Sequence, residues 1–266
     1  MNKIYYILFL IMILCVACEF KLKPNEEDES FKRVEVQRYD RLESRYLTTG
    51  DFSALQQMNT VYPMETRTLV EDVLQLGEVN NPEINSKFLN FYQDTTLQAL
   101  ITEAETQYIS MDDINKDLSE AFAKLESWMP KLPVPVIYAQ IGALNQSIIV
   151  GEKSVGISLD KYLGKDYPLY KKYYSESQRK TMERDYIVPD GLSFYLLSQF
   201  PMSNYDSRPQ LEKDIHMGKV MWIVNKTIEK CFFKTPYVKM VDRYMKKHHN
   251  KTYTQLLKCE DYSVFK

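Results

Sequence analysis

The spacing of apolar residues changes along the chain, and this change limits the fold more than any other feature. From about Phe52 to Met129, apolar residues recur every three or four positions, as on one face of a helix. Three prolines between residues 130 and 135 end that pattern. Short runs rich in branched residues occupy 136–160, and helical spacing then returns. We therefore expect an α+β fold, mainly helical, with one small antiparallel sheet.

The sheet is expected to contain three strands, at 136–141, 147–150 and 155–160. Because the connections between them are short and turn-like, we predict an antiparallel meander, in which each strand pairs with the next. Alternating apolar and polar residues at 33–39 predict a further strand. After the sheet, helices are expected at 192–199 and 215–228.

The N-terminal segment indicates export. Lys3 precedes an apolar run from Ile4 to Ala17, which is shorter than the roughly 20 residues that span a bilayer and fits a secretory signal. Ala17 directly before Cys18 resembles a bacterial lipobox, in which a diacylglycerol is attached to the cysteine after cleavage. We predict a lipoprotein signal peptide at 1–17 and lipid attachment at Cys18. The alternative is a plain signal peptide cut near Ala17.

The next segment is expected to be a spacer. Residues 21–30 are polar and charged and cannot bury enough apolar surface to fold, so 18–30 is predicted to be a lipid anchor and flexible acidic tether. Residues 31–266 are then a single α+β domain, held at the bilayer through acylated Cys18. The expected location is the cell envelope, with the outer membrane favoured and its face left open.

Composition excludes several classes of function. The net charge is −2 and the pI about 6.0, so no overall field attracts nucleic acid. The sequence contains no GxSxG, P-loop or dinucleotide-binding glycine motif, and its one CxxC, Cys15-Val-Ala-Cys18, falls at the predicted signal and lipid-attachment segment. Neighbouring His248 and His249 point about 100° apart on a helix and do not easily share an ion. We predict no cofactor, no metal site and no catalytic residue.

Two further sets of residues leave alternatives open. Cys231 and Cys259 form a disulfide or remain separate thiols. The segment Lys239–Lys251 concentrates positive charge, with tyrosines within and beside it, and is either a solvated helix face or a site for an anionic glycan; the residues are Lys239, Arg243, Lys246, Lys247 and Lys251, with Tyr237, Tyr244 and Tyr253.

A cluster of aspartates and tyrosines follows the last expected strand, and suits either a structural role or recognition. Asp160 is expected to cap the turn that follows, and Gly164 to adopt a positive φ. We also consider Asp190 and His216, the latter as a partly exposed helix residue. The candidate groove or recognition residues are Asp160, Tyr162, Gly164, Asp166, Tyr170, Asp190 and His216.

Several short segments together resemble one family. The most specific is LDKYLGKDYPLY at 159–170, and the others are GALN at 142–145, IVPD at 187–190, LLSQFP at 196–201 and MGK at 217–219. In these segments the chain resembles the GldB family of gliding-motility lipoproteins of Bacteroidota.

The resemblance implies a more distant likeness to zinc peptidases of the zincin type. In those enzymes a helix with an HExxH motif lies behind an edge strand that lines the substrate groove. The helix at 188–199 takes that position here, but it reads Pro189-Asp-Gly-Leu-Ser193 and has no histidine. The later helix offers His216 or Asp214 at best, and Gly218 is expected to allow close helix packing. The resemblance therefore implies a pseudo-metallopeptidase.

Three hypotheses about function follow. The first is a non-catalytic interaction component of gliding, envelope or secretion machinery, with envelope proteins as partners. The second is a divergent peptidase or a glycan hydrolase that uses two of the carboxylates of Asp160, Asp166, Glu183 and Asp190. The third is a glycan- or peptide-binding module built on the tyrosine-rich segment 162–174.

Overall fold

The computed structural model describes residues 33–265. These residues belong to one compact unit, Arg33–Lys266. The predicted signal peptide at 1–17, lipid-attachment residue Cys18 and tether at 18–30 lie outside the described residues. Within 33–265, no helix has both the length and the apolar character needed to cross a bilayer.

Helices precede and follow a small sheet. Before the sheet lie α2 (Tyr39–Thr49), α3 (Phe52–Val61), α4 (Pro63–Arg67), a π-helical turn (Thr68–Val73), α5 (Ile84–Phe91), α6 (Thr95–Gln107) and α7 (Asp112–Trp128). The strands are β1 (Val136–Gln140), β2 (Ile148–Val150) and β3 (Ser154–Ser158). After them lie α8 (Pro168–Tyr173), α9 (Glu176–Arg179), α10 (Ile187–Gln199), α11 (Gln210–Thr227), α12 (Pro236–Lys247) and α13 (Tyr253–Leu257). The mainly helical α+β class is as predicted.

The sheet is mixed, and the predicted antiparallel meander is wrong. The strand order is β1-β3-β2, with β1 parallel to β3 and β2 antiparallel to it. The predicted turn at 151–154 does join β2 to β3. The difference lies in the loop at 141–147, which carries β2 past the position of β3 instead of returning it beside β1.

The strand predicted at 33–39 is reduced to a single bridge between Gln37 and Tyr138. Nearby backbone amides are bound by side chains of α7: Val34 N–H donates to Ser119 Oγ (2.9 Å) and Val36 N–H to Asn115 Oδ1 (3.0 Å). Because these amides are satisfied by a helix, the segment remains extended without joining the sheet as a strand.

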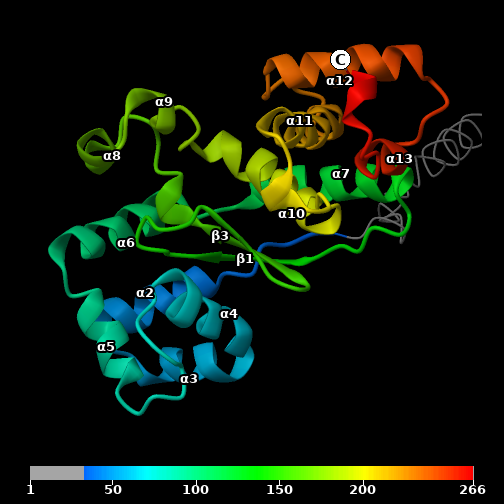
Figure 1. Cartoon of the computed structure of the whole chain (residues 1–266). Coiled ribbons are helices and arrows are strands. Elements are labelled where there is room, and N and C mark those ends of the chain that lie inside the picture. The colour runs from blue at the N-terminus through cyan, green and yellow to red at the C-terminus, as the bar shows by residue number, and fades with distance from the viewer. Residues whose placement is uncertain (1–32, 266) are drawn as a thin grey trace, which may run out of the picture. The chain divides into compact units, whose positions relative to one another are not determined.

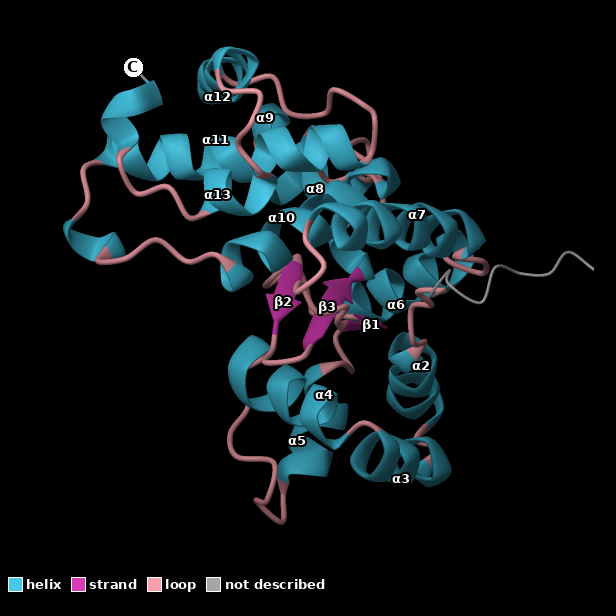
Figure 2. Ribbon diagram, turned by 90° about the vertical axis from the view of Figure 1, so that its right-hand side faces the viewer, coloured by secondary structure: helices cyan, strands magenta, loops and turns pink. Residues whose placement is uncertain are grey.

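The sheet lies between two sets of helices (Figures 1 and 2). Helix α2 packs on β1, and α3, α4 and α5 lie on the same side. On the other side α10 packs on β2 and β3, α11 packs on α10, and α12 packs on α11. Helix α10 therefore lies directly beside the edge strand β2.

Tyrosines are prominent in the core. Several have buried rings and hydroxyls that donate to backbone carbonyls, which avoids leaving those polar groups unpaired, whereas the hydroxyl of buried Tyr39 has no partner within residues 33–265. Tyr92 donates to Ile141 O (2.5 Å) and Tyr108 to Tyr162 O (2.7 Å). These bonds connect α6 and its neighbours to the loops at the ends of β1 and β3.

The close approach of α11 and α12 depends on Gly218. A Cβ atom there would lie 2.7 Å from Tyr237 Cβ and 3.0 Å from the Tyr237 carbonyl carbon. By contrast, a Cβ atom on Gly191 of α10 would meet nothing within 4 Å. Two helical glycines thus differ in whether a methyl group fits.

We expect Gly218→Ala to lower the free energy of unfolding by about 1–3 kcal/mol, because α12 must move away from the added methyl group. Gly191→Ala is the matched control and should be neutral or stabilising by up to about 1 kcal/mol, since alanine favours helix. Urea unfolding followed by circular dichroism measures both. Equal effects of the two substitutions would contradict the packing role of Gly218.

Candidate functional site

Asp160 follows β3 and is fully buried. Its carboxylate accepts hydrogen bonds from the Gly142 amide (2.8 Å) and the Leu144 amide (2.5 Å). Burial raises the pKa of this carboxyl, and the two amides oppose that shift. The predicted cap on the turn after Asp160 is wrong: that turn has no side-chain cap, and the carboxylate instead binds a loop 16–18 residues earlier in the chain.

The loop at 141–145, between β1 and β2, adopts a backbone that needs this support. Ala143 and Leu144 have φ of 50° and 63°, a region that residues other than glycine rarely occupy. The Leu144 carbonyl accepts from Lys161 Nζ (3.1 Å) and from the Tyr174 hydroxyl (3.2 Å). Contacts from several elements therefore hold the loop in its strained form.

Glu43 of α2 is a second buried carboxyl at this end of the sheet, and the sequence analysis missed it. It accepts from the Ile141 amide (2.8 Å) through Oε2, while Oε1 has no partner within residues 33–265. Burial, with Asp160 and Asp40 nearby, raises the pKa of Glu43 well above its ordinary value. The available signal was its position among buried residues on one face of α2, between Tyr39 and Tyr46.

Tyr162 and Asp190 form the next contact along the molecule. The Tyr162 hydroxyl donates to Asp190 Oδ2 (2.9 Å), joining the segment after β3 to the first turn of α10. Burial raises the pKa of Asp190 to about 6, and the hydrogen bond from Tyr162 partly opposes this shift. Asp190 therefore titrates closer to neutral pH than an exposed aspartate does.

A groove runs along the free edge of β2, with a cavity of about 570 Å³. Its walls come from the π-helical turn, β2 and α10, and include Thr68, Asp72, Ile148, Val150, Phe194 and Leu197. Phe194 is 44% exposed there. Within residues 33–265 no strand pairs with the outer edge of β2.

The register shows which backbone groups face this groove. The Ser158 amide donates to Ser147 O (3.0 Å), and the Gly151 amide donates to Ser154 O (2.9 Å). Because hydrogen-bonding direction alternates along a strand, the N–H and C=O groups of Ile148 and Val150 point away from β3. The edge thus presents donors and acceptors with the spacing that another extended chain would use.

The remaining residues of the Asp–Tyr cluster have structural contacts. Tyr170 is buried and its hydroxyl donates to the Asp160 carbonyl, while Gly164 has φ +103°, as predicted. Asp166 is exposed and pairs with Lys171 (3.0 Å). Tyr162 is also buried. Both rings lie in the core, which fits the structural alternative for these two tyrosines.

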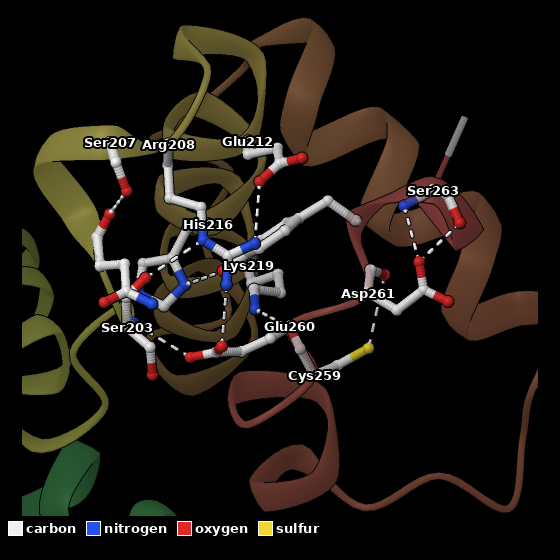
Figure 3. A network of polar contacts seen from close by, with 12 residues as sticks. Ser203, Ser207, Arg208, Glu212, His216, Lys219, Cys259, Glu260, Asp261 and Ser263 are labelled. Atoms are coloured by element: carbon white, nitrogen blue, oxygen red, sulfur yellow. Dashed lines mark hydrogen bonds and ion pairs between the residues drawn. The ribbon is translucent and has the colours of Figure 1, made fainter.

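His216 belongs to a different part of the molecule, where α11 meets the C-terminal segment (Figure 3). It is buried, not partly exposed as predicted, and its Nε2 donates to Phe200 O (3.0 Å) while Nδ1 accepts from the Tyr262 hydroxyl (3.1 Å). Burial, with Lys219 nearby, lowers the pKa of His216 to about 4. The structure does not bring this histidine into contact with Tyr162 or Asp190.

Lys219, one turn further along α11, is fully buried and was also missed. Its Nζ donates to the carbonyls of Leu257 (3.2 Å) and Cys259 (2.7 Å) and lies 4.8 Å from the Tyr262 ring centre. Burial lowers the pKa of Lys219 to about 8. The same tail is held through Glu260, which pairs with Arg208 (2.9 Å) (Figure 3).

These residues do not fit the zinc ion of a zincin. Helix α10 carries no histidine, and both ring nitrogens of His216 are already bonded. Within residues 33–265 no three histidine, cysteine or acidic side chains are grouped to hold a metal.

Cys231 and Cys259 are free thiols, so the alternative of two separate cysteines holds in the structure.

The comparison of the sequence with known families agrees with this arrangement of motifs. The sequence model of a family described as "Gliding motility protein GldB" matches residues 21–232. The chain belongs to this family. Membership of this family identifies the chain as a lipoprotein of the cell envelope and associates it with gliding motility. The matched region contains the 141–145 loop, Asp160, Asp190 and the β2 groove.

Comparison with curated proteins and with solved structures finds no match. The likeness to zincins suggested by the sequence therefore remains a prediction.

We expect Asp160→Asn to lower the free energy of unfolding by about 2–4 kcal/mol, because an amide nitrogen would face a buried backbone N–H and leave it unpaired. Asp166→Asn is the matched control; losing this exposed ion pair should cost less than about 1 kcal/mol. Urea unfolding measures both variants. Equal losses would show that Asp160 does not hold the loop.

Asp190 gives a pH-dependent prediction. Its folded pKa of about 6 lies above its ordinary value of 3.8, so the folded state takes up a proton between these values. As pH rises from 4 to 7, the wild type should therefore lose about 2 kcal/mol of stability relative to Asp190→Asn. Urea unfolding of both proteins at several pH values measures the difference. Tyr162→Phe removes the hydrogen bond that lowers the pKa of Asp190, so the stability should be lost over a higher pH range. A stability difference between the wild type and Asp190→Asn that does not vary with pH would contradict a buried carboxyl with a raised pKa.

Proposed function

We propose that the protein is a membrane-anchored, non-catalytic component of the cell envelope that binds an extended protein segment along the edge of β2. It would act in gliding motility or in related envelope or secretion machinery. GldB family membership supports the envelope and motility parts of this proposal. The observation that carries the binding role is the groove beside α10, into which the unpaired edge of β2 opens.

An extended segment suits this groove better than a compact ligand does. Added beside β2, it would accept from and donate to the outward groups of Ile148 and Val150. Its alternate side chains would contact Phe194 and Leu197 on α10. Main-chain bonds would supply affinity, and the apolar wall would select side chains.

The positions of the carboxylates support a role without catalysis. Asp160 is occupied by loop amides, Asp166 pairs with Lys171, and Glu183 pairs with Lys165 (3.2 Å). A glycan hydrolase of the usual kind needs two carboxylates facing one bond. Three of the four residues considered for such a pair thus have other partners.

The binding role is tested by photocrosslinking in cells. We expect p-benzoylphenylalanine in place of Phe194 to form an adduct with an envelope protein, with the crosslink mapped to an extended segment of that partner. Phe52 of α3 is the matched control, being 76% exposed and outside the groove lining, and should give no such adduct. Ile148→Pro, which removes one outward N–H and leaves the bonds to β3 intact, should abolish the adduct at position 194.

Equal adducts from both positions, or an adduct insensitive to Ile148→Pro, would contradict binding at the strand edge. Circular dichroism of the Ile148→Pro protein checks that the fold is retained.

Asp190 favours a second candidate function, a divergent hydrolase. A carboxyl with a pKa of about 6, hydrogen-bonded to Tyr162 on an element that lines the groove, has the properties of a general acid or base. The same crosslinking experiment separates the two functions. A bound partner that is cut in the wild type but intact with Asp190→Asn would favour the hydrolase, and a partner intact in both favours binding alone.

A further inference from the structure

A second groove lies between the C-terminal half of α11 and the N-terminal half of α12, with a cavity of about 1050 Å³. Its apolar wall includes Trp222, Val238 and Met240. Trp222 is almost fully buried, and its Nε1 donates to Asp242 Oδ1 (3.0 Å). The volume is at the upper end of the range for small-molecule pockets.

The charges around this groove are unbalanced. Four cations line it: Lys226, Lys230, Lys239 and Arg243. None has a carboxylate within 4.0 Å among residues 33–265. Lys226 lies over the Trp222 ring, with Nζ 5.3 Å from the ring centre. The cations therefore surround an apolar surface with no carboxylate in direct contact, and Asp242 attracts Lys226 only from beyond that distance.

The two acidic residues of the groove form their ion pairs elsewhere, because each binds a cation outside the lining. Glu229 binds Lys124 (2.9 Å), and Asp242 binds Lys246 (2.8 Å). Glu229 also has φ 53° just beyond the end of α11, a strained backbone at the point where the chain turns to line the groove. The local arrangement thus leaves positive charge beside the apolar wall.

We propose that this groove binds an anionic amphiphile, a molecule with a phosphate-type head and an acyl chain. The cations suit the head, and the surface of Trp222, Val238 and Met240 suits the chain. A purely polar anion would leave the apolar wall wet, and a neutral chain would leave the cations unpaired. The lining of this groove shares no residue with that of the proposed peptide groove, so the two sites are separate.

Only part of the segment Lys239–Lys251, which the sequence left open as a solvated face or an anionic-glycan site, lines this groove. Lys239 and Arg243 line the groove, whereas Lys246 and Lys247 do not. The tyrosines of this region are not free for stacking on sugars: Tyr244 is buried, and Tyr253 packs against Trp128 and Trp222. The structure thus favours an occupant with an acyl chain over a glycan.

Cys231 provides a reporter within the protein. It is an exposed free thiol that lines the groove, while the other free thiol, Cys259, lies outside the lining. We expect octyl phosphate to slow alkylation of Cys231 by iodoacetamide about tenfold, with Cys259 unchanged as the internal control. The full-length protein in neutral dodecylmaltoside serves for this measurement, with peptide mass spectrometry as the readout.

Three matched probes test the chemistry. Inorganic phosphate carries the head alone, octanol the chain alone, and octyl phosphocholine a neutralised head. We expect weak or no protection from each. Equal protection by inorganic phosphate would reduce the site to general anion attraction, and equal protection by octanol or octyl phosphocholine would show that the cations select nothing. Either result, or no protection by octyl phosphate, would overturn the proposal.

Variants localise the effect. Replacing Lys226, Lys239 and Arg243 by glutamine should raise the concentration of octyl phosphate needed for half-protection by about tenfold or more. Lys247→Gln with Lys251→Gln removes two nearby exposed charges that neither line the groove nor pair with Asp242, and should change the half-protection concentration less than about twofold. Equal losses in the two proteins would attribute binding to overall charge and overturn the assigned site. Circular dichroism verifies that both variants fold.

Discussion

The carboxylate of Asp160 binds the amides of Gly142 and Leu144, and through them it fixes how the sheet is ordered. Together with the bonds from Lys161 and Tyr174 to the Leu144 carbonyl, these two acceptors hold the left-handed backbone of the loop. Without these bonds, the chain would lack the turn that carries β2 beyond β3. The position of β2 at the edge, and the groove beside α10, are consequences of that turn. A buried charge at this point is therefore an architectural element, whose desolvation is offset by backbone donors.

The two grooves place different chemistry on different elements. The β2 groove presents backbone donors and acceptors, and its lining lies within the residues that the GldB family model matches. The groove between α11 and α12 presents unpaired cations over an apolar wall, and half of its lining residues, from Pro236 to Arg243, lie beyond the family match. A tethered protein with both would contact a protein partner and an amphiphile at separate surfaces. Each surface is accessible to test without disturbing the other.

Local patterns in the sequence were sufficient for the class of the fold and for several helices, but not for α2 (Tyr39–Thr49). Helical spacing and the prolines located α7, α10 and α11, since these signals act over a few residues. Strand order was not predictable in this way, because it depends on Asp160 reaching back to a distant loop. The same reason explains Glu43 and Lys219, whose partners lie far away in sequence. His216 was misjudged because Tyr262, which covers it, lies 46 residues later.

The burial of Lys219 joins the stability of two parts of the chain that lie about 40 residues apart. Its ammonium group is satisfied by the carbonyls of Leu257 and Cys259, and without them a charge would stand in a dry core. If the segment around Cys259 opens, Lys219 must regain water, and α11 has to loosen with it. Helix α11 and that segment should therefore open as one cooperative unit rather than separately.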